Sequence, residues 1–122
     1  MKQRIGGKPS RAVICDSTFQ RSNDSAHKII LGVDPSLRGT GFGIIQIGGP
    51  QPQSLAHGTI SCPKNWERSR CLAKISETLR DLLKKKQPDV CVIEGLFYAQ
   101  NLQTALIMGE ARGAAIAAIA GF

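Results

Sequence analysis

The sequence lacks a long apolar run and a paired-cysteine motif. No stretch approaches the roughly 18 apolar residues that a membrane span needs, because even the apolar C-terminal segment contains Glu110 and Arg112. The four cysteines show neither C-x-x-C spacing nor a nearby pair of histidines, and no secretory leader precedes them. A zinc site and an extracellular disulfide framework are therefore unsupported, and we expect a reduced, cytoplasmic protein.

Acidic residues are also few relative to basic ones. The 122 residues include 16 Lys and Arg against 9 Asp and Glu, a net charge of +7, which favours polyanionic partners such as nucleic acid. Six basic and two acidic residues, a net +4, lie in residues 1 to 28. Apart from a short apolar patch at 12 to 15, residues 1–27 show no sustained periodic spacing of apolar residues. We interpret them as a basic, flexible extension.

Hydrophobic periodicity predicts one α/β domain over residues 28–122. Three strands are expected at 28 to 34, 39 to 49 and 55 to 62, and short links join them into an antiparallel meander. An amphipathic helix over 66 to 86 leads to a strand over 89 to 95 and a second helix over 101 to 121. A strand reached through a crossover helix runs parallel to an earlier strand, so the predicted sheet is mixed.

The two helices carry recognisable end signals. Asn101 is a predicted N-cap of the second helix, and Gly121 a predicted stop. Lys84 to Lys86 close the first helix before Pro88, where cations complement the helix dipole, and this explanation competes with a DNA-binding patch.

Two acids end apolar strands, Asp34 in "GVDPSLRGTG" and Glu94 in "VCVIEGLF". An aspartate beside Pro and Gly is commonly a turn former, and that alternative stays open for Asp34 alone. Glu94 is poorly explained as a turn residue. If their strands are parallel neighbours, both carboxylates reach the carboxyl edge of the sheet, where α/β sheets place ligands. Adjacent anions repel unless a hard cation lies between them, and Mg²⁺ is the usual one.

Three quoted stretches carry a family resemblance. "ILGVDPSLRGTGFGII", "HGTI" and "QPDVCVIEGLFYAQNLQTALIMGEARGAAIAA" resemble the RuvC family of Holliday junction endonucleases, in the same order and spacing. The likeness covers residues 29 to 121. It implies an RNase H-like fold, in which a three-stranded antiparallel meander and a parallel strand form a mixed sheet with flanking helices.

The resemblance also implies a function. It implies a homodimeric, Mg²⁺-dependent endodeoxyribonuclease that cuts four-way DNA junctions in recombination and repair, with two ions in the complete site and Mn²⁺ as a substitute. Asp34 and Glu94 match two of the family's four acidic metal ligands. A branch-migration complex is a further partner that the resemblance implies.

DNA-binding residues are carried over in the same way. Phe97 matches the family's aromatic residue that stacks on an unpaired base at the junction centre, with Tyr98 beside it; a core position is the alternative for Phe97. Arg38 and Thr40 are candidate phosphate contacts, and the alternative is that they only shape the turn. The helix from Asn101 resembles the one that pairs across the family's dimer, although its glycines could equally pack on the sheet.

The sequence departs from the family at several points. Ser36, Leu37 and Gly95 stand where the family has Gly, Ser and Gln, and the chain stops at Phe122. We therefore expect the domain over 28–122 to lack the family's last strand and its C-terminal helix with two further aspartates, and to hold Mg²⁺ weakly.

Two other functions stay open. One is an inactive or truncated homologue that binds branched DNA without cutting it. The other, more remote, is a fragment of an actin-like or sugar-kinase ATPase. The stretch "GVDPSLRGTG" also resembles the first phosphate loop of that ATPase fold.

Overall fold

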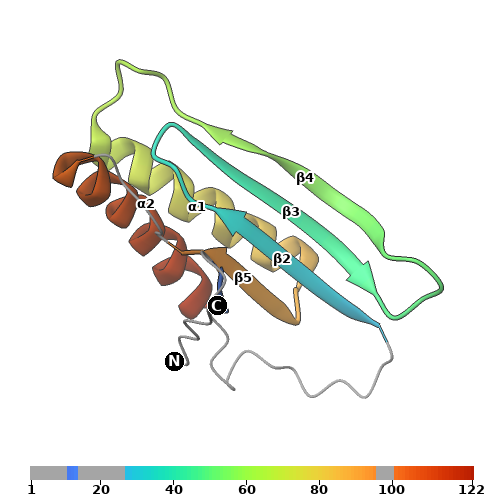
Figure 1. The fold of residues 1–122 in the computed structure, drawn as a ribbon. Coiled ribbons are helices and arrows are strands. Elements are labelled where there is room, and N and C mark those ends of the chain that lie inside the picture. Colours follow the sequence, from blue (N-terminus) through green and yellow to red (C-terminus); the bar gives the residue numbers. More distant parts are fainter. Residues whose placement is uncertain (1–10, 14–26, 96–100) are drawn as a thin grey trace.

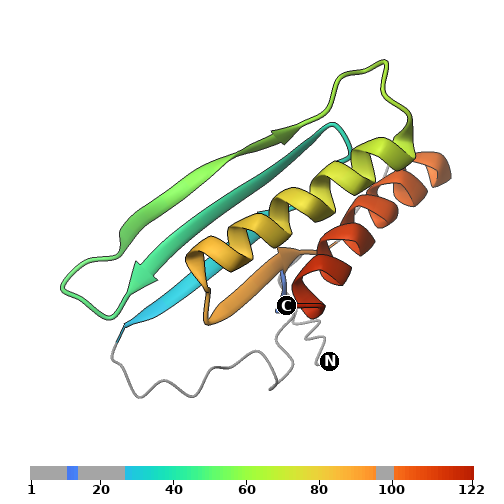
Figure 2. The ribbon, with the colours of Figure 1, turned by 180° about the vertical axis from the view of Figure 1, so that it is seen from behind.

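The computed structural model describes residues 11–13, 27–95 and 101–122. The elements in chain order are β1 (Arg11–Val13), β2 (Lys28–Asp34), β3 (Gly39–Ile47), β4 (Gln53–Ser61), α1 (Arg68–Lys86), β5 (Val90–Glu94) and α2 (Leu102–Ala120). Figure 1 shows the strands in one layer with α1 and α2 behind it, and Figure 2 shows the two helices in front. Both helices thus cover the same face of the sheet.

The sheet is mixed, as the sequence predicts. Its strand order is β1-β5-β2-β3-β4. The β2–β3 and β3–β4 pairs are antiparallel, whereas β5 runs parallel to β2. The meander and the crossover through α1 are therefore confirmed, although β4 begins at Gln53 rather than at residue 55.

The strand β1 differs from the expectation of a flexible extension over residues 1–27. Arg11–Val13 pairs antiparallel with β5, in a register that runs from Arg11↔Glu94 to Val13↔Val92. This pairing engages backbone N–H and C=O groups along an edge of β5 that would otherwise be open. Three residues are too few to show a period-2 pattern, so the sequence carried no usable strand signal here.

One hydrophobic core lies between the sheet and the helices. In α1 the buried side chains recur every four residues, which places them in one stripe. In α2 most buried positions are alanine, which lets the helix approach the sheet closely. The principal core residues are Leu31, Val33, Ile44, Ile75, Leu79, Leu83, Ile93, Ala111, Ala115 and Ile119.

The helix ends follow the predicted signals. The Thr104 N–H donates to Asn101 Oδ1 at 2.8 Å, which confirms the N-cap of α2. The helix α1 ends at Gln87, whose φ of 49° is left-handed and whose N–H donates to Leu83 O. Of the two described helices, neither has the combination of length and apolar character needed to cross a bilayer.

Candidate functional site

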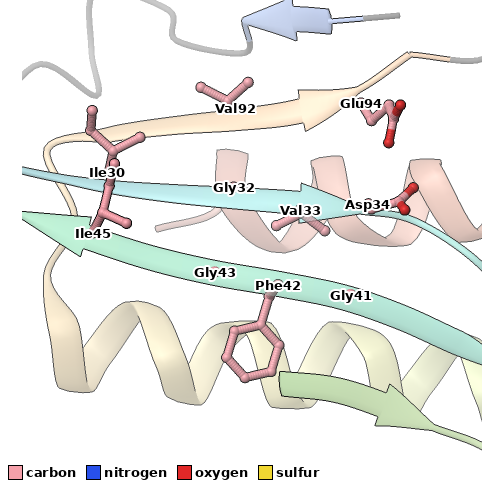
Figure 3. A pocket seen from close by; sticks show the side chains of 10 residues that line it. All are labelled: Ile30, Gly32, Val33, Asp34, Gly41, Phe42, Gly43, Ile45, Val92 and Glu94. Atoms are coloured by element: carbon pink, nitrogen blue, oxygen red, sulfur yellow. The ribbon is translucent and has the colours of Figure 1, made fainter. Parts of the chain in front are cut away.

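Asp34 and Glu94 occupy the ends of neighbouring parallel strands. The β2–β5 register pairs Val33 with Ile93, so the two acids follow one residue later on each strand. Strands of a sheet lie about 4.8 Å apart, and both acids are exposed. Figure 3 shows their carboxylates at the same end of the sheet, as the sequence predicts.

An open hollow of about 500 Å³ extends from the two acids along the sheet. It lies on the face away from the helices, because Ile30, Gly32 and Asp34 of β2 alternate with the core residues Leu31 and Val33. Its lining, seen in Figure 3, consists of Ile30, Gly32, Val33, Asp34, Gly41, Phe42, Gly43, Ile45, Val92 and Glu94. Apolar side chains therefore lie at one end of the hollow and the carboxylates at the other.

Glycines keep the middle of this hollow free of side chains. Gly32 and Gly43 are cross-strand partners, and Gly41 is the partner of Asp34. A Cβ at Gly41 would lie 3.8 Å from the Cβ of Asp34, and a Cβ at Gly43 would meet nothing within 4 Å. The absence of side chains leaves room for a group to approach the Asp34 carboxylate from the sheet side.

Thr40 fixes the turn that follows Asp34. It is fully buried, and its Oγ1 donates to Ser36 O at 2.6 Å and accepts from Ser36 N–H at 3.2 Å. A buried hydroxyl with both bonds inside the turn does not reach a DNA phosphate. The structure thus favours the turn-shaping alternative for Thr40 over the predicted DNA contact.

Arg38 ties the same turn to the segment between β4 and α1. Its Nη1 donates to Pro63 O at 2.7 Å and to Trp66 O at 2.9 Å, and it lies 3.0 Å from Cys71 Sγ. These acceptors lie 25 to 33 residues away along the chain. These bonds show that Arg38 shapes the turn, and contact of its other guanidinium nitrogens with a DNA phosphate stays a prediction.

The cysteines beside this clamp have a distinct electrostatic setting. Burial raises the pKa of the Cys62 thiol, and the hydrogen bond and charge of Cys71 raise it further. The cations of Lys74 and Arg38 oppose that shift in pKa. Cys62 therefore stays protonated to a higher pH than an ordinary cysteine.

The pair of carboxylates fits part of a site for a hard cation. Carboxylate oxygens exposed to water are the donors that Mg²⁺ prefers, since this ion usually keeps several of its waters. Within the described ranges, no three His, Cys, Asp or Glu side chains gather as ligands. Asp34 and Glu94 are thus the two carboxylates that this end of the sheet offers to a cation among the residues described.

Two predicted DNA-binding residues, Phe97 and Tyr98, lie outside the described residues. Sequence reasoning missed another feature, the stacking of Arg70 on Trp66 with Lys74 nearby. Its signal was present in the spacing of Trp66, Arg70 and Lys74, each four residues after the one before, around the start of α1.

Comparison with known proteins extends these observations. The family model described as crossover junction endodeoxyribonuclease RuvC matches residues 30–121. The RuvC crossover junction endodeoxyribonuclease of Thermotoga maritima is 42% identical over 91 residues, which are 75% of this chain and 54% of the relative. That of Bordetella avium is 40% identical, over 75% of this chain and 50% of the relative. The chain spans about half the length of the curated relatives it matches.

Solved structures share the fold. The complex of T. thermophilus RuvC with a Holliday junction substrate superposes with a TM-score of 0.73 at 19% identity, over 77% of this chain and 58% of that one. A second Thermus thermophilus RuvC structure gives a TM-score of 0.67 at 22% identity, over 76% and 58%. These likenesses confirm the predicted RNase H-like fold. Since the family model covers most of its residues, the chain belongs to the RuvC family.

Proposed function

We propose that this chain acts as a structure-specific endonuclease that resolves four-way DNA junctions by metal-dependent phosphodiester hydrolysis, in recombination and repair. The carrying observation is the placement of Asp34 and Glu94 at adjacent ends of parallel strands, above an open hollow. Membership of the RuvC family and the Holliday junction bound by the Thermus relative support the choice of substrate. The family match also disfavours the remote ATPase alternative.

Asp34 and Glu94 are the proposed catalytic metal ligands. The proposed cation is Mg²⁺, with Mn²⁺ as a substitute and two ions in a complete site. Such cations, when bound, activate a water for in-line attack and stabilise the leaving oxygen of the phosphodiester. The chain's own part is to fix the ligands, because the Thr40–Ser36 bonds set the turn after Asp34 and the glycines leave space beside it.

The partners follow from the same proposal. Phe97 and Tyr98 are proposed to contact bases at the junction centre. A homodimer is proposed through α2, where Leu102 and Leu106 are 77% and 59% exposed. A branch-migration complex and a cytoplasmic location complete the proposal.

A second candidate function is binding of branched DNA without cleavage. The observation that favours it is the presence of only two acids in the candidate metal site among the described residues. Two carboxylates hold Mg²⁺ less firmly than a full ligand set.

Cleavage of a labelled synthetic four-way junction, with Mg²⁺ or Mn²⁺, tests both candidates. We expect paired nicks from the wild type, and a loss of at least about 100-fold in rate for Asp34→Asn and for Glu94→Gln, since even outer-shell changes cost 10- to 100-fold. Asp81→Asn, an exposed position on α1, is the matched control and should cut normally.

The outcomes separate the candidates. Junction that is bound but left intact with either metal favours the binding function. Cutting that survives Asp34→Asn at the wild-type rate rules out the assigned ligands.

A further inference from the structure

The connection from β4 to α1 gathers cations around the one tryptophan of the sequence. The guanidinium carbon of Arg70 lies 3.7 Å from the centroid of the Trp66 ring, and Lys74 Nζ lies 5.4 Å from it. Arg70 and Lys74 are one helical turn apart, so they share a face of α1. We call residues 62 to 74 the basic corner.

The basic corner is held in a defined shape. Arg38 binds the carbonyls of Pro63 and Trp66 from one side, and Lys74 Nζ donates to Ser61 O from the other. Trp66 also packs on the small buried cluster that includes Leu37 and Cys71. The Trp66 ring and the two cations are therefore positioned before any ligand arrives, which lowers the entropy lost on binding.

The charge of the basic corner is unbalanced. It contains four basic residues and one acidic residue. Arg68 is paired with Glu110 of α2, at 3.1 Å between Nε and Oε2, so its charge is partly offset. Arg70 and Lys74 instead gather over one aromatic ring, where two like charges repel each other and an anion would relieve the repulsion.

The basic corner lies at the end of the sheet that carries the two acids. In Figure 1 the β4–α1 connection and the start of α2 lie at the end toward which β2 and β5 point. Arg38 joins the corner directly to the turn after Asp34. The acids lie on the open face of the sheet and α1 covers the other face, so a DNA arm that reaches the acids would meet the corner by passing around this end of the sheet.

We propose that the basic corner binds backbone phosphate of a DNA arm beside the Asp34–Glu94 site. Stacking engages the face of the Arg70 guanidinium, so its in-plane N–H groups remain directed outward and can meet phosphate oxygens in a fork. Lys74 adds a second positive charge. This inference rests on the proposed function for its substrate, and it adds a contact that positions the arm without reading its sequence.

The single tryptophan makes a direct test available. In buffer with EDTA, a synthetic four-way junction is titrated into the full chain at several salt concentrations while Trp66 emission and its quenching by acrylamide are followed. We expect DNA to change the emission and to protect Trp66 from acrylamide, because the ring lies under the proposed phosphate contact.

Matched variants identify the contact. R70Q/K74Q removes two charges from the corner, and K84Q/K85Q removes two from the exposed far end of the same helix. The logarithm of the association constant K for DNA falls linearly with the logarithm of the salt concentration. We expect R70Q/K74Q to reduce the magnitude of this slope by about 1 to 2, since each phosphate contact contributes about 0.9. The slope of K84Q/K85Q should equal that of the wild type, and circular dichroism should show that both variants remain folded at the temperature of the titration.

Several results would overturn the inference. These are equal slope losses in both variants, an unchanged slope in R70Q/K74Q, unprotected Trp66 in the wild-type complex, or a wild type that binds no DNA. Since the titration contains no metal, it is independent of cleavage. A chain that binds through the corner and never cuts contradicts the nuclease proposal alone; one that cuts while R70Q/K74Q keeps its slope contradicts the corner alone.

Discussion

Arg38 satisfies acceptors in three residues with one guanidinium nitrogen, and this role can be tested by a substitution that keeps the charge. In Arg38→Lys the side chain is shorter and ends in a tetrahedral ammonium, so its nitrogen cannot occupy the position from which Nη1 contacts Pro63 O, Trp66 O and Cys71 Sγ. We expect the free energy of unfolding to fall by about 1–3 kcal/mol, the usual penalty for an unsatisfied polar group. Urea unfolding measures it, with Arg80→Lys on the exposed side of α1 as the control.

The outcome of that substitution distinguishes two roles. A loss of stability confined to Arg38→Lys supports the clamp, and Trp66 emission should shift with it. Equal stability of Arg38→Lys and the wild type would mean that Arg38 contributes only charge.

Cys62 gives stability a pH dependence whose sign follows from its raised pKa. The unfolded thiol ionises near its ordinary value of 9.0, whereas the folded thiol keeps its proton to a higher pH. The folded state then binds more protons, so the contribution of Cys62 is present below pH 9.0 and is lost as pH rises through the folded pKa. We expect urea unfolding to show a steeper decline above pH 9.0 for the wild type than for Cys62→Ala. Parallel declines would contradict the raised pKa.

At the scale of elements, the ring of Phe42 on β3 lies close over Gly58 on β4. The two are cross-strand partners, and a Cβ at Gly58 would lie 3.1 Å from Cζ of Phe42. Because this contact is tighter than an ordinary van der Waals contact, the Phe42 ring must shift, and we expect Gly58→Ala to lower the free energy of unfolding by about 1–3 kcal/mol through overpacking. The penalty should shrink in a Phe42→Leu background, which a double-mutant cycle measures.

Gly43 is the matched control for that experiment. A Cβ there meets nothing within 4 Å, so Gly43→Ala should leave stability unchanged or raise it by about 0.5 kcal/mol. If both glycines respond equally, the effect comes from backbone freedom and the contact with Phe42 is irrelevant.

Asp89 locks the parallel register that brings the two acids together. Its Oδ2 accepts from the Ile29 N–H at 2.8 Å, and its own N–H donates to Ile29 O at 2.7 Å. Asp89→Ala leaves the Ile29 N–H without this acceptor, and we expect the free energy of unfolding to fall by about 1–3 kcal/mol. Asp89→Asn keeps a carbonyl acceptor and should lose less. Hydrogen exchange of the Ile29 amide should quicken in Asp89→Ala, and an unchanged rate would show that the carboxylate is dispensable.

At the scale of the whole molecule, the site was predictable as far as it depends on chain topology. The crossover through α1 makes β5 parallel to an earlier strand, and its place beside β2 then brings Glu94 to the edge that Asp34 occupies. The cap at Asn101 was predictable because it depends on residues only three positions apart.

Features that depend on tertiary contacts were not predictable. The burial of Thr40 and the acceptors of Arg38 follow from how the β2–β3 turn meets residues 62 to 71, which are distant in sequence. The strand β1 depends on a free edge of β5, which three residues of sequence do not reveal. Local pattern thus predicted the two acids, and packing decided the roles of their neighbours.

The exposed side of α2 bears on the assembly of the molecule. Leu102 and Leu106 are large, apolar and mostly exposed, whereas Ala111 and Ala115 further along face the core. If two copies pair through this side of α2, as proposed, Leu106→Glu places a charge in the interface and should shift the dimer to monomer in sedimentation velocity.

The same substitution should leave the fold intact, because Leu106 is 59% exposed within one chain. Gln103→Glu, on an exposed position of the same helix, adds an equal charge and is the matched control. The urea concentration at the unfolding midpoint is extrapolated to low protein concentration, where any dimer has dissociated. This extrapolated midpoint should be the same for both variants and the wild type. A wild-type chain that sediments as a monomer at every concentration would rule out pairing through α2, and a dimer that both variants preserve would place the interface on another surface.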